Sequence, residues 1–94
     1  MVSPRIDAIN LVKDCLHDIY STIAFGDYED IQFASYYSSS LKDILRGLIK
    51  TKKSPLIFLE DYRDQMDEFY KIKKNLIFDV GGSVAQYLID LLVE

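Results

Sequence analysis

Residues 76–93 read LIFDVGGSVAQYLIDLLV, and this stretch decides the fold class of the chain. Leu76 to Phe78, followed by Asp79 and two glycines, can form a short strand and a turn, with Ser83 as the cap of a last helix. The other interpretation is one helix, because apolar residues recur at helical steps: Ile77, Val80, Val84, Tyr87 or Leu88, and Leu91. A lone strand would have no pairing partner in an otherwise helical chain, so we predict a helix over 76–93.

The glycine pair Gly81-Gly82 lies inside this predicted helix. Each glycine in a helix interior costs about 1 kcal/mol relative to alanine. We therefore predict that the pair allows a neighbouring helix to approach closely. In the alternative with a strand and a turn, the same glycines supply the turn conformation.

The preceding segment begins with Ser54-Pro55, a hydroxyl N-cap followed by proline at the first helical position. Apolar residues then follow at steps of three and four: Leu59, Tyr62, Met66 and Phe69. Three lysines mark the last turn of this helix: Lys71, Lys73 and Lys74. Asn75 can cap either this helix or the next one.

Two further helices are predicted in the first half of the chain. Ser3-Pro4 opens a helix over residues 4–25 that Gly26 ends, and Asp27 is the candidate cap of a helix over 28–50. The two apolar stripes are Ile9, Val12, Leu16, Ile19 and Ile23, widened by Cys15 and Tyr20, and then Leu41, Ile44, Leu45, Leu48 and Ile49. Ser38–Ser40 interrupt the second stripe and are a place where that helix can bend. Four amphipathic segments with short connections predict an all-α, antiparallel four-helix bundle that forms one domain over residues 1–94.

Composition limits the partners that this domain can bind. Eleven Lys and Arg against 15 Asp and Glu give a net charge of −4, the opposite of the basic surface that nucleic acids select. Cys15 has no second cysteine to pair with, which is typical of a reducing cytoplasm. No uninterrupted apolar run reaches membrane-spanning length. We therefore expect a cytoplasmic protein without direct contact to nucleic acid or membrane.

No motif in the sequence predicts catalysis or cofactor binding. Asp14, His17 and Asp18 share one helical turn and could hold a metal ion, but a solvated helix face gives such triplets more often. Cys15 lies on an apolar stripe, where a thiol is usually inert. Ser38–Ser40 lack the glycines of a nucleophile elbow, and Gly81–Ser83 lack the spacing of a phosphate loop. The prediction is a protein that is not an enzyme and has no metal or cofactor.

Two groups of residues are candidates for binding a protein partner. Residues 60–68 carry five acids and one base, and Asp61, Asp64 and Glu68 fall on one helix face, with Asp67 beside them. Such a negative stripe suits a basic partner, although a solvated helix face is the commoner cause. Tyr36 and Tyr37 are the second group, because neighbouring helix positions point about 100° apart and both cannot enter a bundle core. A tyrosine that buries its ring and leaves its hydroxyl in water explains the pair equally well.

Residues 54–62, SPLIFLEDY, resemble a helix start of small helical bacterial immunity proteins of the colicin D type. The resemblance implies an acidic helical inhibitor that covers the active site of a cognate toxin, often an RNase. From their local charge, Asp61, Asp64, Asp67 and Glu68 are the residues expected to meet it. The alternative is a self-associating regulatory or structural bundle, with a homodimer seam formed by Tyr36, Tyr37 and the Gly81-Gly82 region.

Overall fold

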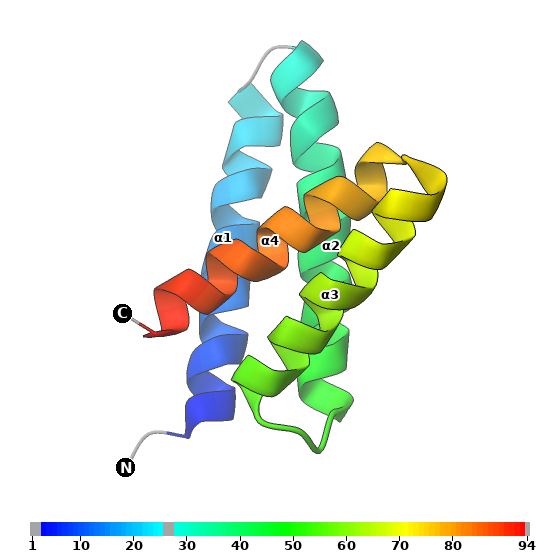
Figure 1. Cartoon of the computed structure of the whole chain (residues 1–94). Coiled ribbons are helices and arrows are strands. Elements are labelled where there is room, and N and C mark those ends of the chain that lie inside the picture. Colours follow the sequence, from blue (N-terminus) through cyan, green and yellow to red (C-terminus); the bar gives the residue numbers. More distant parts are fainter. Residues whose placement is uncertain (1–2, 26–27, 94) are drawn as a thin grey trace.

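The computed structural model describes residues 3–25 and 28–93, except for the side chains of residues 22–31. Within these ranges the chain forms helices only, and Figure 1 shows their arrangement. The four helices are α1 (Pro4–Phe25), α2 (Tyr28–Lys50), α3 (Pro55–Lys73) and α4 (Leu76–Val93). The predicted end at Gly26 and cap at Asp27 lie outside the described residues. All four predicted helices are confirmed, and α2 runs through its serines as one helix.

The helices form two antiparallel hairpins, α1 with α2 and α3 with α4 (Figure 1). The α4 helix crosses the first hairpin obliquely and packs mainly on α3 and α2. This arrangement confirms the all-α antiparallel bundle. Because residues 76–93 are one helix, the alternative with a strand and a turn is wrong.

Local side chains explain why α3 and α4 begin and end where they do. The Ser54 hydroxyl accepts a hydrogen bond from the Ile57 amide at 3.4 Å, and Pro55 follows at the first position. Lys74 adopts a left-handed conformation (φ 51°) that ends α3. The Asn75 side chain accepts a hydrogen bond from the Ile77 amide at 3.0 Å. Asn75 therefore caps α4 rather than α3.

The core is supplied unequally by the helices. Its largest fully buried side chains are Val12, Leu41, Ile44, Leu48, Leu59, Val84 and Leu88. Leu16 is buried as its stripe predicts, whereas Leu45 is only half-buried. Ile49, Phe69 and Ile77 were expected in the apolar stripes but lie on the surface. Ile49 and Ile77 belong to the terminal turns of their helices. Phe69 lies nearer the middle of α3 and contacts the Phe78 ring of α4, yet its side chain stays partly exposed.

Every glycine that the structure describes lies at a helix–helix contact. Gly81 and Gly82 are buried, and a Cβ atom at Gly81 would lie 3.1 Å from Met66 Cγ of α3. At Gly82 it would meet the Asp67 carboxylate, and at Gly47 of α2 it would overlap the Phe58 ring. The predicted close approach at the glycine pair is confirmed. The pair is buried and is covered by α3 of the same chain.

One arginine ties the two ends of the first hairpin together. The Arg5 guanidinium, at the start of α1, donates hydrogen bonds to the carbonyl oxygens of Thr51 and, at 3.1 Å, of Lys53. These oxygens follow the end of α2, where a helix leaves carbonyl groups without partners and carries partial negative charge. Arg5 therefore fixes α1 to the connection that leads into α3.

Among the described helices, α4 is long and apolar enough to cross a membrane, with a mean hydropathy of 1.6 over 18 residues. The sequence expectation considered only uninterrupted apolar runs and did not identify this segment. In the bundle, 39% of α4 is buried. The core helix of a small bundle has the same length and hydropathy.

Candidate protein-binding surface

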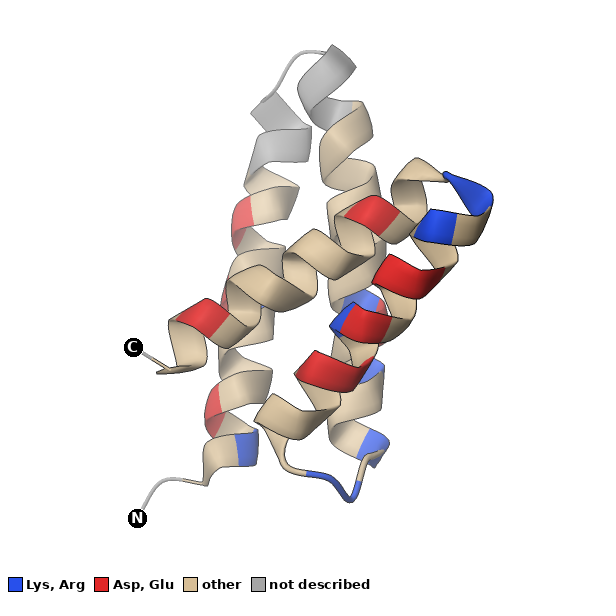
Figure 2. Cartoon of the chain, in the orientation of Figure 1, with Lys and Arg blue, Asp and Glu red and all other residues tan. Residues whose placement is uncertain are grey.

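Five carboxylates line the outer side of α3, and all five residues are exposed. At 3.6 residues per turn they fall within about a third of the helix circumference. Leu59, which is buried, lies on the other side of the helix. Figure 2 shows the acidic positions along α3, next to α4. We call it the acidic face: Glu60, Asp61, Asp64, Asp67 and Glu68.

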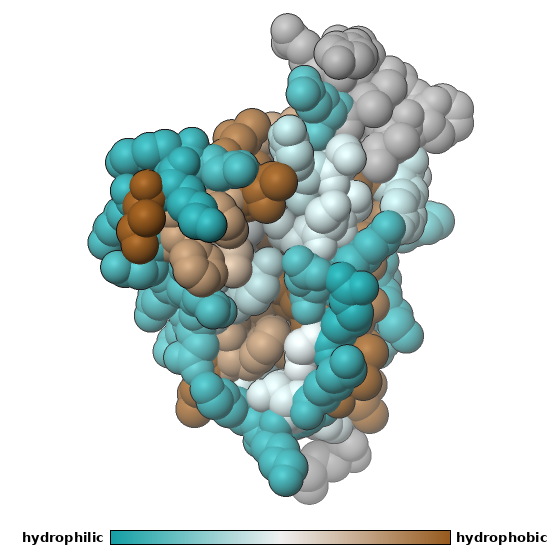
Figure 3. Space-filling model, turned by 90° about the vertical axis from the view of Figure 1, so that its right-hand side faces the viewer, coloured by the Kyte–Doolittle hydropathy of each residue, from teal (hydrophilic) through white to brown (hydrophobic). Residues whose placement is uncertain are grey.

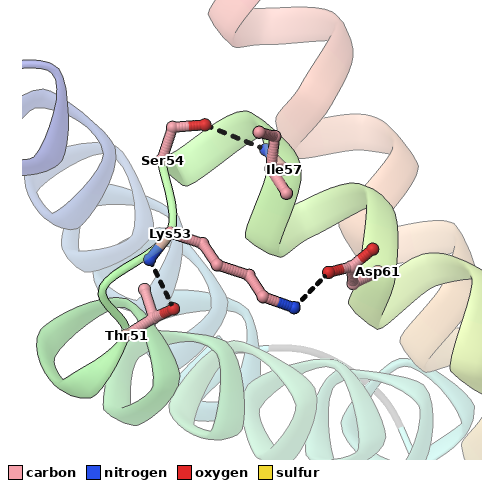
Figure 4. Close-up of polar contacts among 5 residues, drawn as sticks. All are labelled: Thr51, Lys53, Ser54, Ile57 and Asp61. Atoms are coloured by element: carbon pink, nitrogen blue, oxygen red, sulfur yellow. Dashed lines mark hydrogen bonds and ion pairs between the residues drawn. The ribbon is translucent and has the colours of Figure 1, made fainter.

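The first turn of the acidic face is partly neutralised by the connection before α3. Lys53 Nζ lies 2.7 Å from Asp61 Oδ2, and both side chains are more than half exposed (Figure 4). The same connection is held by a hydrogen bond from the Lys53 amide to the Thr51 hydroxyl at 3.1 Å. An exposed ion pair of this kind contributes about 0–1 kcal/mol. Asp61 can therefore change partners at little cost.

Arg63 joins the acidic face to α4. Its guanidinium lies 3.0 Å from Asp64 Oδ1 and donates to the Gln86 side-chain oxygen at 2.9 Å. Gln86 in turn donates to Asp90 at 2.8 Å. This chain of polar contacts fixes the orientation of Arg63, while the Asp64 side chain remains 67% exposed.

The far end of the acidic face carries the least compensated charge. Within the described side chains, Asp67 and Glu68 form no ion pair. Asp67 lies against Gly82, so its carboxylate is held at the border with α4. Glu68, the next residue along α3, is also exposed. These two carboxylates are therefore the least neutralised part of the acidic face.

Tyr36 and Tyr37 are both half-buried, and each lines a different hollow of the surface. Tyr36 contacts a shallow hollow that it shares with Phe33 and Leu76. Tyr37 lines a groove of about 220 Å³ with Tyr87 of α4 on another side of it. Neither tyrosine is fully buried and neither is exposed, so the pair lies at the border of the core.

The structure does not bring the two predicted groups together. The tyrosines lie beside Leu76 and Tyr87 on one flank of α4. The acidic face lies along the other flank, where Arg63 bonds to Gln86. A partner that covers both groups must therefore reach across α4.

The groove beside Tyr37 contains residues that the sequence did not identify as a site. Its lining is Cys15, Asp18, Ile19, Tyr37, Leu41 and Tyr87. Burial raises the pKa of the Tyr37 phenol, and Tyr87 adds to this rise. Tyr87 was recognised only as a possible stripe residue, because nothing in its own helix indicates that Tyr37 lies opposite.

The candidate metal and thiol chemistry of α1 finds little support. Burial raises the pKa of the Cys15 thiol, and Asp18 and Asp14 add to the rise, so the reactive thiolate is disfavoured. Among the side chains that the structure describes, no three of His, Cys, Asp or Glu come close enough to hold a metal ion. Ser38 donates a hydrogen bond to the Ser35 carbonyl at 2.9 Å, which is a local helix contact.

Comparison of the chain with protein families, characterised proteins and solved structures found no match.

Proposed function

We propose that this chain is a protein-binding module that acts without catalysis, as an immunity- or antitoxin-like inhibitor of a basic toxin. The observation that carries the proposal is the acidic face, in which Asp67 and Glu68 have no ion-pair partner within the described residues. The net charge of −4 supports the same choice of partner. A bacterial cytoplasm is the compartment that this role and the single cysteine favour.

The acidic face would work by charge complementarity. A nuclease binds phosphates with Lys and Arg, and a rigid row of carboxylates can occupy the same side chains. Long-range attraction would speed the encounter over about one Debye length, about 10 Å at 0.1 M salt. Asp61 and Asp64 would exchange Lys53 and Arg63 for cations of the toxin.

The packing of α3 supports the proposal, because it fixes the acidic face before a partner binds. α3 is capped at its start by Ser54 and connected to α4 through Arg63 and the glycine contacts. Its carboxylates are therefore held on a fixed helix before the partner arrives, which lowers the entropy cost of binding. The proposal requires no catalytic residue, metal or cofactor.

The test begins with capture of the partner from the native host and identification by mass spectrometry. The partner produced alone should stop growth, and co-production of this chain should restore it. Asp64→Lys with Glu68→Lys should then weaken binding at least tenfold, about 1.4 kcal/mol, and abolish the rescue. Both side chains are exposed, so the thermal midpoint should stay nearly unchanged.

The matched control is Asp7→Lys with Asp14→Lys, which changes the net charge equally on exposed positions of α1. It should leave affinity within about threefold of the wild type, because only long-range charge has changed. A partner that lacks a basic surface would contradict the proposal. An equal loss of affinity in both double variants would show that net charge, not the acidic face, drives binding.

A further inference from the structure

Aromatic and aliphatic side chains gather at the end of the molecule where α3 meets α4. The rings of Phe69 and Phe78 pack against each other across the turn, tilted by 45° and with centroids 5.3 Å apart. On the neighbouring side, Leu76 shares a shallow hollow with Phe33 and Tyr36 of α2. Three helices therefore contribute apolar side chains at this end of the molecule.

Much of this surface remains in contact with water. Ile72 is 70% exposed, Phe33 52% and Ile77 47%. Figure 3, which views the molecule from the side of the α3–α4 turn, shows hydrophobic side chains among hydrophilic ones. Single exposed apolar residues need no explanation, but several at one end of a molecule can form an interaction site. We call this group the apolar tip: Phe33, Phe69, Ile72, Leu76 and Ile77.

Lysines surround the apolar tip. Lys71, Lys73 and Lys74 are all exposed, and the acid in the adjoining first turn of α4 is Asp79 (Figure 2). Residues 69–79 therefore carry three lysines against one acid, whereas Asp67 and Glu68 precede them on α3 and the whole chain is negative.

We propose that the apolar tip docks onto the surface of an anionic lipid membrane. Exposed apolar side chains enter the boundary between headgroups and acyl chains, and neighbouring lysines extend to the anionic headgroups. A second copy of the chain fits less well. Its acidic face would satisfy the lysines, but its carboxylates would leave the exposed Ile72 and Ile77 side chains uncovered by apolar groups.

This docking does not require α4 to cross the membrane. Only its first turn, with Leu76 and Ile77, belongs to the apolar tip, and the buried residues from Val80 to Ile89 stay in the bundle. The inference does not rest on the proposed function, since it uses the lysines and apolar residues at the end of α3, which follow the acidic face directly. It revises the expectation of no membrane contact, which rested on apolar runs and not on the surface that folding assembles.

Co-sedimentation of the full chain with lipid vesicles tests the proposal. Binding to vesicles of equal parts phosphatidylglycerol and phosphatidylcholine should exceed binding to phosphatidylcholine alone at least tenfold, and should fall as salt rises. Lys71→Gln with Lys73→Gln should weaken binding about thirtyfold, since each lysine near an anionic surface contributes about 1 kcal/mol. Ile72→Ser with Ile77→Ser should weaken it by at least about tenfold, because apolar area no longer leaves water.

Matched controls lie at the other end of the bundle. Lys50→Gln with Lys52→Gln removes two positive charges, as the tip variant does. Ile49→Ser with Ile57→Ser replaces two exposed isoleucines that lie outside the tip. Both controls should bind vesicles as the wild type does. Failure to sediment, equal binding to both vesicle types, or equal losses in the tip and control variants would overturn the proposal. So would concentration-dependent dimerisation that the tip variants abolish in a chain that ignores vesicles, because the tip would then join two copies.

Discussion

α3 and α4 form one hairpin, yet they contribute to the molecule in different ways. α4 buries seven residues, Val80, Gly81, Gly82, Val84, Ala85, Leu88 and Ile89, whereas α3 buries only Leu59. α3 can therefore carry many charges on its outer side at little cost to folding. The difference indicates that substitutions in α4 will mainly change stability, and substitutions on the acidic face will mainly change binding.

Truncation of a core leucine should give the largest effect. Leu88 of α4 is fully buried, so Leu88→Ala should lower the free energy of unfolding by about 2–5 kcal/mol. Glu68→Ala on α3 is the matched truncation, and it should change that free energy by less than about 0.5 kcal/mol. Urea denaturation followed by circular dichroism measures both. Similar losses in the two variants would mean that the helices do not differ in this way.

The glycines should give the next largest effect, with different outcomes at two contacts. Gly47→Ala places a methyl group into the rigid Phe58 ring, so we expect a loss of about 1–3 kcal/mol. At Gly81 the neighbour is the flexible Met66 side chain, which can move by a few tenths of an ångström. Gly81→Ala should therefore gain up to about 1 kcal/mol from helix propensity.

A double-mutant cycle separates the ring contact from a general intolerance of alanine at Gly47. If the ring is the cause, Phe58→Leu should remove most of the cost of Gly47→Ala. A loss above about 1 kcal/mol in Gly81→Ala would show that α3 and α4 pack more rigidly than the Met66 contact implies.

The Tyr62 phenol, on the inner side of α3, should have the smallest effect on the free energy of unfolding, and only at alkaline pH. Burial raises the pKa of the Tyr62 phenol, the charge of Asp43 adds to the rise, and a hydrogen bond from Ser40 opposes it. A folded-state pKa above the unfolded value of about 10 means that the unfolded chain loses this proton first. The stabilisation that the protonated phenol contributes is therefore fully present below about pH 10, and it is lost as the pH rises through the folded-state pKa.

Tyr62→Phe should accordingly reduce the decline of the free energy of unfolding above pH 10. Tyr20→Phe, at an exposed position of α1, is the control and should leave that decline unchanged. Identical alkaline declines in Tyr62→Phe and the wild type would contradict a contribution from this phenol.

Much of the fold could be predicted because its determinants are local. Ser54-Pro55 and the steps of three and four specify helices without any knowledge of their neighbours. The surface depends on packing between helices, which leaves no recognisable pattern in the sequence. Examples are the Arg5 contacts, the Phe58 ring on Gly47 and the groove shared by Tyr37 and Tyr87. The same holds for the apolar tip, since Phe33 lies far from Ile72 along the chain.

The acidic face could be predicted in part from the sequence. Helical spacing is enough to place Asp61, Asp64 and Glu68 on one side of a helix. It does not reveal that Lys53 and Arg63 pair with the first two acids. The structure therefore separates two acids that are paired within the chain from Asp67 and Glu68, for which it shows no ion pair among the described side chains.

The association rate with the captured partner, measured by stopped flow as salt concentration rises, tests the role of the acidic face most directly. The rate should fall steeply with salt for the wild type and only weakly for Asp64→Lys with Glu68→Lys, because these carboxylates would steer the encounter. A wild-type rate that is independent of salt, or an equal dependence in the two proteins, would contradict this role of α3.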